Sequence, residues 1–164
     1  MKALNTGDLH LTNRCPINRI DNYEEEVLRK FHWILTTAYS NNCKTILQPG
    51  DFSDAPNLSY DFFIKICSLI NHSNITIVTV PGQHDFRYRN ANNTFLRALE
   101  EACPSLIVLW KPQYIEIEGV HIYGSGWGEQ IPEIQDLTKY NILITHRMVV
   151  DEKLWDNQEN FNYA

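Results

Sequence analysis

Residues 75–80, ITIVTV, followed directly by residues 81–85, PGQHD, decide the fold that this sequence predicts. The first six residues are apolar or β-branched, as is typical of a buried strand, and the Pro-Gly pair ends that strand abruptly. An amide, an imidazole and a carboxylate then follow in the next loop. The stretch therefore predicts a buried strand whose end delivers three polar side chains to one place.

Three further segments of the chain have the same arrangement, a short apolar run that ends on Asp or His. Residues 3–6 lead to Asp8 and His10, residues 45–49 lead to Asp51, and residues 141–145 lead to His146. In an open α/β sheet, the side chains at the carboxyl ends of the strands meet in one crevice. Asp and His are ligands of divalent cations, and a carboxylate can bridge two of them. The four strand ends therefore predict a two-metal site.

The segments between these strands predict helices. Apolar side chains at helical spacing indicate a helix over residues 23–40, with Asp21 or Asn22 as the N-cap and acidic residues in its first turn. We also expect helices around residues 62–70 and from residue 93 or 94 to 103, a strand at 106–109, a hairpin over 114–123, a glycine-rich loop at 124–128 and a short helix at 132–137. Strands that alternate with helices predict a parallel sheet with right-handed connections.

Composition limits the class of protein. The chain has 164 residues, 43% of them hydrophobic, which suits one domain with a real core. Its four cysteines form no C-x-x-C pair, which favours buried reduced thiols in a cytosolic protein over disulfides or a zinc site. We see no signal peptide and no apolar run of membrane-spanning length, so we expect a cytoplasmic protein. The net charge of −6 argues against a broad basic surface for nucleic acid, but two bound cations would add about four positive charges locally.

The strand-end motifs are similar to those of a known family. Residues 7–10 (GDLH), 50–51 (GD), 81–85 (PGQHD) and 144–146 (ITH) resemble, in order and spacing, the D-x-H, G-D, G-N-H-D and isolated H motifs of calcineurin-like metallophosphoesterases. The layout around them most resembles the SbcD-type DNA repair nuclease subunits and their phage relatives. This resemblance implies an α/β fold, the metallophosphoesterase four-layer sandwich, with two mixed β-sheets flanked by helices.

The resemblance also implies a role for each motif residue. Asp8 and His10 would hold one metal ion, Asp51 would bridge two ions, and Gln83 with His146 would hold the second. His84 would lie near the reacting phosphate as a general acid, with Asp85 fixing its tautomer and orientation. The implied enzyme is a metal-dependent hydrolase, a DNA exonuclease or endonuclease of DNA repair, with manganese favoured over Mg²⁺, Fe²⁺ or Zn²⁺. A DNA substrate, an SbcC-type ATPase partner and a homodimer would follow from the same relatives.

The sequence departs from the family pattern in two places. Gln83 stands where the family usually has Asn, which lengthens the ligand by one methylene. No G-H-x-H motif follows His146, although the family uses it to give one histidine to each metal. We therefore expect a chain truncated at its C-terminus, with a metallophosphoesterase domain core over residues 1–150 and an acidic polar segment over residues 151–164 that begins the missing remainder.

Other interpretations stay open. The same motifs would serve a phosphodiesterase or phosphatase for small phosphate esters, or a weakly catalytic or non-catalytic scaffold that binds a protein. Outside the motifs, we expect His32, His72 and His121 to be ordinary surface or boundary residues and Asp54 to be a turn or N-cap residue. Arg87, Tyr88 and Arg89 fit a DNA-contacting loop and a solvated loop about equally well, and Trp127 is expected to be a packed loop aromatic or to line the substrate mouth.

Overall fold

The computed structural model describes residues 1–88, 90–147 and 162–163. Strands and helices alternate along the first part of the chain, and strands dominate the second part. The elements are β1 (Ala3–Asn5), α1 (Tyr23–Ser40), β2 (Thr45–Gln48), α2 (Tyr60–Ser73), β3 (Thr76–Thr79), a 3-10 turn (Gln83–Asp85), α3 (Phe95–Ala102), β4 (Leu106–Val108), β5 (Gln113–Ile117), β6 (Val120–Ser125), β7 (Tyr140–Thr145) and β8 (Asn162–Tyr163).

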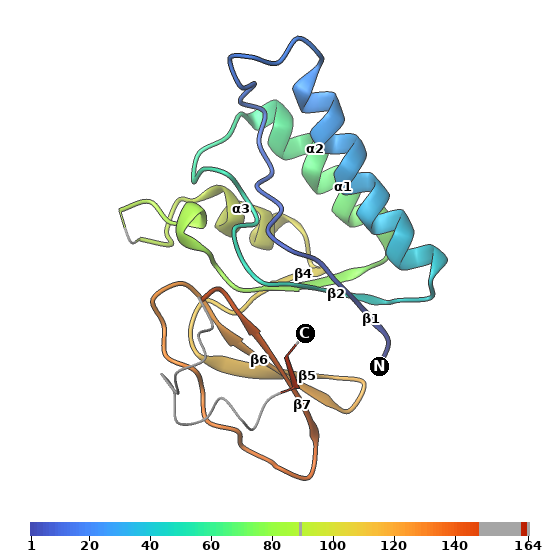
Figure 1. Cartoon of the computed structure of the whole chain (residues 1–164), viewed down its shortest axis with the longest axis vertical. Coiled ribbons are helices and arrows are strands. Elements are labelled where there is room, and N and C mark those ends of the chain that lie inside the picture. Colours follow the sequence, from blue (N-terminus) through green and yellow to red (C-terminus); the bar gives the residue numbers. More distant parts are fainter. Residues whose placement is uncertain (89, 148–161, 164) are drawn as a thin grey trace.

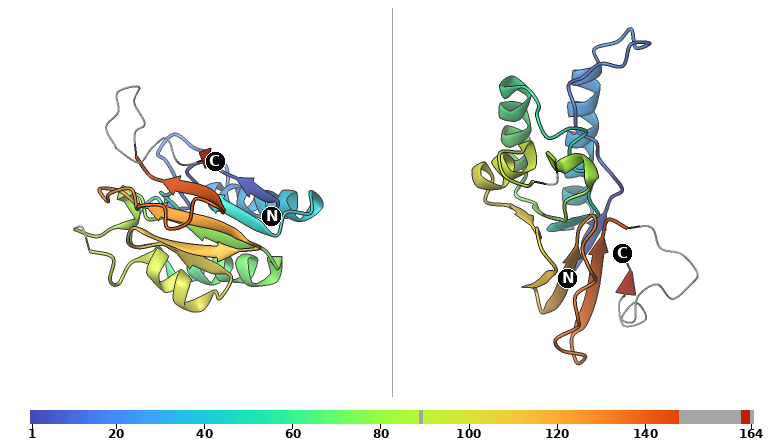
Figure 2. Two further views of the ribbon diagram at one scale, coloured as in Figure 1. Left: turned by 90° about the horizontal axis from the view of Figure 1, so that it is seen from below. Right: turned by 90° about the vertical axis from the view of Figure 1, so that its left-hand side faces the viewer.

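Two four-stranded sheets form the framework. The first has the order β1-β2-β3-β4 and is parallel throughout, whereas the second has the order β5-β6-β7-β8 and is mixed, because only β5 and β6 are antiparallel. The three helices cover one face of the first sheet, and the second sheet lies on its opposite side (Figures 1 and 2). The predicted α/β class with two sheets and flanking helices is confirmed. The first sheet differs from the expected mixed sheet, because a helix connects each of its strands to the next.

Helix α1 begins where its sequence predicts. The side chain of Asn22 accepts a hydrogen bond from the Glu25 backbone N–H, which satisfies one of the donors left open at a helix N-terminus. Phe31, Leu35 and Ala38, spaced three or four residues apart, are buried on one face of the helix. The predicted helix, its limits and the Asn22 cap are therefore confirmed.

Two apolar cores hold the layers together. The larger core lies between the helices and the first sheet, and includes Phe31, Phe62 and Ile66. The second core lies between the sheets and consists of Leu47, Val78, Val80, Leu109, Ile122 and Ile144, with partly buried neighbours around it. Burial of large aliphatic side chains is the main favourable term in folding, at about 25 cal/mol per Å² of apolar surface. This packing fixes the ends of β2, β3 and β7 relative to one another.

The segment from residue 126 to 139 contains no helix, so the short helix expected at 132–137 is wrong. Ile131 and Ile134 pack against Tyr123 and Leu143 on the outer face of the second sheet. The backbone N–H of Gln135 donates to the Tyr123 hydroxyl at 2.8 Å. These contacts hold the segment in an irregular conformation, because it is anchored to the sheet at separate points.

Two further expectations about the second sheet are corrected. Gly124 and Ser125 belong to β6 rather than to a loop, and Gly124 pairs with Ile144 of β7. A Cβ on Gly124 would lie 2.5 Å from the Cβ of Leu109, so this close approach requires glycine. His121 is 5% exposed rather than at the surface, because its ring packs 4.8 Å from that of Tyr114.

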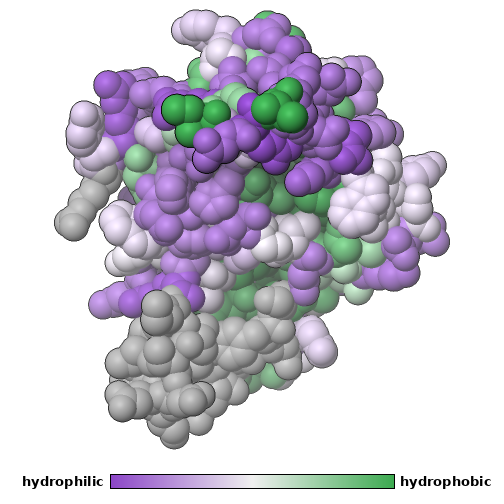
Figure 3. Space-filling model, turned by 45° about the horizontal axis from the view of Figure 1, so that its top comes forward, coloured by the Kyte–Doolittle hydropathy of each residue, from purple (hydrophilic) through white to green (hydrophobic). Residues whose placement is uncertain are grey.

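The surface at the helical end is mostly hydrophilic, with small separate hydrophobic patches (Figure 3). His32 and His72 are exposed, as expected. Among the described helices, none is both long and apolar enough to cross a membrane. Arg89, and all of the predicted acidic segment 151–164 except the strand β8, lie outside the described residues.

Candidate metal centre

The loops that follow β1, β2, β3 and β7 converge at one edge of the two sheets. The backbone N–H of His10 donates to the Asp51 carbonyl at 2.9 Å, which ties the first loop to the second. The backbone N–H of His84 donates to Asp51 Oδ1 at 2.9 Å, which ties the third loop to the second. The backbone N–H of His146 donates to the Ser125 carbonyl at 3.1 Å as β7 ends. Hydrogen bonds within the protein therefore hold these four chain segments together without a bound ligand.

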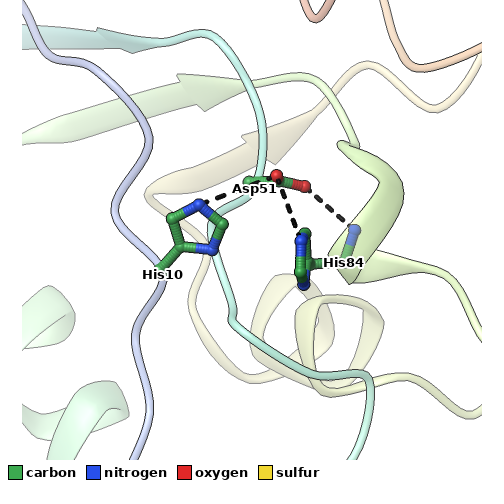
Figure 4. Close-up of side chains that lie close together, drawn as sticks. All are labelled: His10, Asp51 and His84. Atoms are coloured by element: carbon green, nitrogen blue, oxygen red, sulfur yellow. Dashed lines mark hydrogen bonds and ion pairs between the residues drawn. The ribbon is translucent and has the colours of Figure 1, made fainter.

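Asp51 lies at the centre of the site. Its side chain is only 1% exposed, and its Oδ2 atom has no hydrogen-bond partner among the described residues. Three imidazole Nε2 atoms surround this oxygen, at 3.4 Å for His146, 3.8 Å for His10 and 3.9 Å for His84. Figure 4 shows two of these rings, His10 and His84, turned toward the carboxylate from two different loops.

The tautomers of two of these histidines follow from their backbone contacts. Nδ1 of His146 is 2.9 Å from the Pro49 carbonyl oxygen, and Nδ1 of His84 is 3.0 Å from the Asp54 carbonyl oxygen. A carbonyl oxygen can only accept a hydrogen bond, so Nδ1 carries a proton in both rings. In a neutral ring, Nε2 then carries the lone pair. Nε2 of His146 faces two acceptor oxygens, Asp51 Oδ2 at 3.4 Å and Gln83 Oε1 at 2.8 Å, an arrangement that requires a proton or a cation between these atoms. This pattern, in which the other ring nitrogen is held by a carbonyl, is the usual one for metal-binding histidines.

The residues present fit divalent cations. Two sets of three side chains, His10, Asp51 and His84 in one and Asp8, Asp51 and His146 in the other, each have their ligand atoms within 4.8 Å of one another. A buried carboxylate oxygen without a donor is unfavourable by itself, and a cation held between it and the neighbouring lone pairs would satisfy all of them. Because Asp51 belongs to both sets, the geometry suits two ions that share one carboxylate.

Asp8 and Gln83 complete this cluster. Oδ2 of Asp8 lies 4.0 Å from Nε2 of His10, and Oδ1 of Asp8 lies 4.0 Å from Nδ1 of His146. Asp8 therefore lies between the two sets. The Oε1 atom of Gln83 lies 2.8 Å from Nε2 of His146. The longer amide side chain therefore still reaches the centre. Six of the predicted side chains therefore lie together: Asp8, His10, Asp51, Gln83, His84 and His146.

The hydrogen bonds of the Asp85 carboxylate go to residues other than His84, which corrects the role that the resemblance implied. Its fully buried carboxylate accepts hydrogen bonds from the backbone N–H groups of Phe52 (3.1 Å), Ser53 (2.9 Å) and Gly82 (2.9 Å), and from the Ser53 hydroxyl (2.8 Å). Burial raises the pKa of Asp85, and these four donors act in the opposite direction. In a 3-10 turn, successive side chains point about 120° apart. Asp85 therefore faces inward and joins two loops, while the Asp54 carbonyl orients His84.

Gln48 is a positioning residue that sequence reasoning missed. Its side chain is fully buried at the end of β2, where its amide N–H donates to the Gly50 carbonyl and its Oε1 accepts from the Gly50 N–H at 3.1 Å. The Thr79 hydroxyl donates to the same Oε1 atom. Gln48 therefore holds the turn that presents Asp51, whose φ of 49° lies in the left-handed region. A polar residue at the end of a buried strand was the available signal.

Two glycines make room for the cluster. A Cβ on Gly82 would lie 2.1 Å from Asp51 Oδ1, and a Cβ on Gly50 would lie 2.5 Å from Nδ1 of His146. Gly50 also has φ of 115°, which side chains rarely adopt. Asp54 was expected to be a turn residue, but its Oδ1 lies 3.6 Å from Nδ1 of His10, at the edge of the cluster.

Comparison with known proteins gives three findings. The model of the family described as calcineurin-like phosphoesterase matches residues 1–163. A DNA double-strand break repair protein, Mre11 of Sulfolobus acidocaldarius, is 24% identical over 159 residues, which cover 90% of this chain and 41% of that protein. The nuclease MPE of Pseudomonas putida is a structural neighbour with a TM-score of 0.48 and 18% identity, over 86% of this chain and 59% of that one. The chain thus spans about two fifths of the curated relative that it matches.

Proposed function

This chain belongs to the calcineurin-like phosphoesterase family, and from that premise we propose that it is a metal-dependent phosphoesterase that hydrolyses DNA phosphodiesters at a two-metal site. The observation that carries the proposal is the buried Oδ2 atom of Asp51, which has no donor within residues 1–88, 90–147 and 162–163 and is surrounded by three imidazole nitrogens. The similarity to a DNA repair protein supports DNA as the substrate. We assign the catalytic core to residues 1–150.

We assign five side chains as metal ligands. Asp51 would be shared, His10 would lie on one side, and His146 and Gln83 would lie on the other. Asp8 would serve either ion, because one of its oxygens lies near each set. When bound, two divalent ions lower the pKa of an attacking water and stabilise charge on the attacking and leaving oxygens of a phosphate.

His84 is kept for proton transfer. The Asp54 carbonyl holds its Nδ1–H, so the ring cannot turn freely and its Nε2 faces the centre of the site. When the ring is doubly protonated, Nε2–H is the proton that can pass to the leaving oxygen. Asp85 supports this step indirectly, because it ties the loop that carries His84 to residues 52 and 53.

The net charge of the chain also bears on the substrate. At −6, the chain would repel a polyanion, so affinity for DNA has to come from a local positive field. Two divalent ions at the predicted centre would supply about four positive charges where a phosphate must lie. Phosphodiester binding should therefore depend strongly on metal. An ATPase partner of the SbcC type is a further proposal, which rests on the resemblance alone.

The test combines calorimetry with hydrolysis. We would titrate Mn²⁺ into the parent chain and into Asp51→Asn, and assay both on single-stranded DNA, duplex DNA and bis(p-nitrophenyl) phosphate. Asp61→Asn is the matched control, because Asp61 is an exposed carboxylate on α2 that pairs with Lys65. We expect binding and DNA cleavage in the parent and the control, and neither in Asp51→Asn. Cleavage of the small ester without DNA would indicate a small-ester phosphodiesterase, and metal binding without any cleavage would indicate a scaffold.

A further inference from the structure

An open pocket next to the metal centre has aromatic walls. It has a volume of about 420 Å³ and is lined by Phe86, Trp127, Gly128 and Glu129. The centroids of the Phe86 and Trp127 rings are 6.4 Å apart at 45°, and Trp127 is 41% exposed. The volume lies in the usual range for small-molecule sites, about 300–1,000 Å³. The metal chemistry described above uses neither aromatic ring.

Both walls are held in place. The backbone N–H of Trp127 donates to the Pro81 carbonyl at 2.9 Å, and a Cβ on the preceding Gly126 would lie 2.8 Å from Pro81. Phe86 packs edge-on against Trp110, at 6.2 Å between ring centroids. Trp110 is in turn fixed, because its indole N–H donates to Glu100 at 2.7 Å. The aromatic pair is therefore anchored to the same loop that carries Gln83 and His84.

The aromatic pocket continues into the metal centre. A second pocket, of about 380 Å³, is lined by Trp127 together with three of the proposed ligands, Asp8, Gln83 and His146. Trp127 therefore borders both spaces. A molecule whose phosphate lay at the metal centre could place a neighbouring group against the indole without leaving the surface.

The aromatic walls select which part of a substrate fits there. Glu129 also lines this pocket, and the Arg147 guanidinium donates to its backbone carbonyl at 2.7 Å, so ionisable residues of both signs lie at the pocket margin. A planar ring would stack on the indole, and such stacking accepts any base because every base has a π-face. In a nucleic acid strand, that ring is the base attached to the cleaved or the adjacent nucleotide.

We propose that Trp127, with Phe86 as the second wall, forms a stacking subsite for one unpaired nucleobase of the strand whose phosphodiester lies at the metal centre. This inference rests on the proposed function and makes it more specific. A base inside a duplex is already stacked on its neighbours, so the subsite selects single strands, frayed ends or gaps. Trp127 then determines substrate preference and plays no part in metal binding.

The test measures binding, so that it does not depend on turnover. The probes are a dye-labelled oligothymidylate and the same backbone built from abasic tetrahydrofuran units, both with phosphorothioate linkages to slow cleavage. Their charge is equal, so the ratio of their dissociation constants reports the bases alone. We expect the parent to bind the oligothymidylate at least about fivefold more tightly, the lower end of what stacking one base contributes.

Substitutions assign that preference to Trp127. Trp127→Ala and Trp127→Leu should both bring the ratio close to one, since neither retains a π-face, and Trp127→Phe should retain part of it. Trp33→Ala is the control, because Trp33 is an exposed tryptophan on α1, and it should keep the parent ratio. Thermal unfolding and Mn²⁺ titration should be unchanged in all four variants.

Two results would overturn the subsite: equal binding of both probes by the parent, or a parent-like ratio in Trp127→Ala and Trp127→Leu. Failure of the proposed function gives a different pattern. In that case, the parent binds no Mn²⁺ and cleaves no phosphodiester, whatever the ratio between the two probes.

Discussion

Replacement of Asp51 by Asn should stabilise the metal-free protein. In the parent, the buried Oδ2 atom of Asp51 has no donor in the part of the chain that the structure describes, and an unsatisfied buried polar atom costs about 1–3 kcal/mol. Asparagine keeps the Oδ1 that accepts from the His84 N–H, and its amide N–H groups can donate to the Nε2 lone pair of His146, 3.4 Å from Oδ2. We therefore expect Asp51→Asn to raise the free energy of unfolding by about 1–3 kcal/mol. For a chain of this length, that raises Tm by roughly 2–12 °C.

Added metal should reverse the order of stability. Saturation of the parent with Mn²⁺ at about 100 times the dissociation constant adds about 2.7 kcal/mol, which corresponds to roughly 5–11 °C in Tm. Asp51→Asn should gain nothing, because it lacks the shared ligand. Asp51→Asn is thus expected to stabilise the metal-free protein and to remove the rise in Tm on addition of Mn²⁺. A general packing defect does not produce this pair of effects.

The assay is thermal unfolding followed by circular dichroism at pH 8, first with a chelator and then with Mn²⁺. Asp61→Asn serves as the control, since it removes an exposed carboxylate and should respond to Mn²⁺ as the parent does. A lower Tm for Asp51→Asn in chelator, together with a parent Tm that Mn²⁺ does not move, would refute the reasoning.

Of four other predictions, two concern the site and two concern the buried thiol of Cys103 in the larger core. His84→Ala should keep its Mn²⁺ stoichiometry in calorimetry but lose about 10²–10⁴ in the hydrolysis rate, and loss of an ion would instead make His84 a ligand. Gly82→Ala should destabilise the fold by about 1–3 kcal/mol in urea unfolding and abolish Mn²⁺ binding, because its Cβ would lie 2.1 Å from Asp51 Oδ1. Burial raises the pKa of Cys103 from 9.0 to about 12, so at pH 8 a thiol reagent should modify exposed Cys15 and leave Cys103 intact. Since unfolded Cys103 ionises at lower pH than the folded residue, its contribution to stability is complete below pH 9 and should fall between pH 9 and 12, which urea unfolding at several pH values would detect.

Local signals made much of the fold predictable. The N-cap of α1 at Asn22, its apolar spacing and the β-branched run of β3 each depend on near neighbours in sequence. The expected helix at 132–137 failed because long-range contacts with Tyr123 and Leu143 decide that segment. Gly124 was misjudged for the same reason, since its role is to let β6 approach Leu109.

The candidate site was predictable as a set of residues and less so as a geometry. Strand ends identified Asp51 and its partners, because parallel strands bring their carboxyl ends together. Sequence spacing could not show that the carboxylate of Asp85 turns inward to residues 52 and 53, nor that the Asp54 carbonyl holds His84. Those contacts depend on the rotation of a 3-10 turn and on backbone groups, which all residue types share.

The most direct measurement is an anomalous difference map from crystals of the chain grown with Mn²⁺. We predict two peaks on either side of the Asp51 carboxylate, about 3.5–4 Å apart, with Nε2 of His10 and of His146 next to different peaks. A map without a peak at Asp51, or with a single ion that Asp51 does not bind, would contradict the two-metal centre on which the proposed function rests.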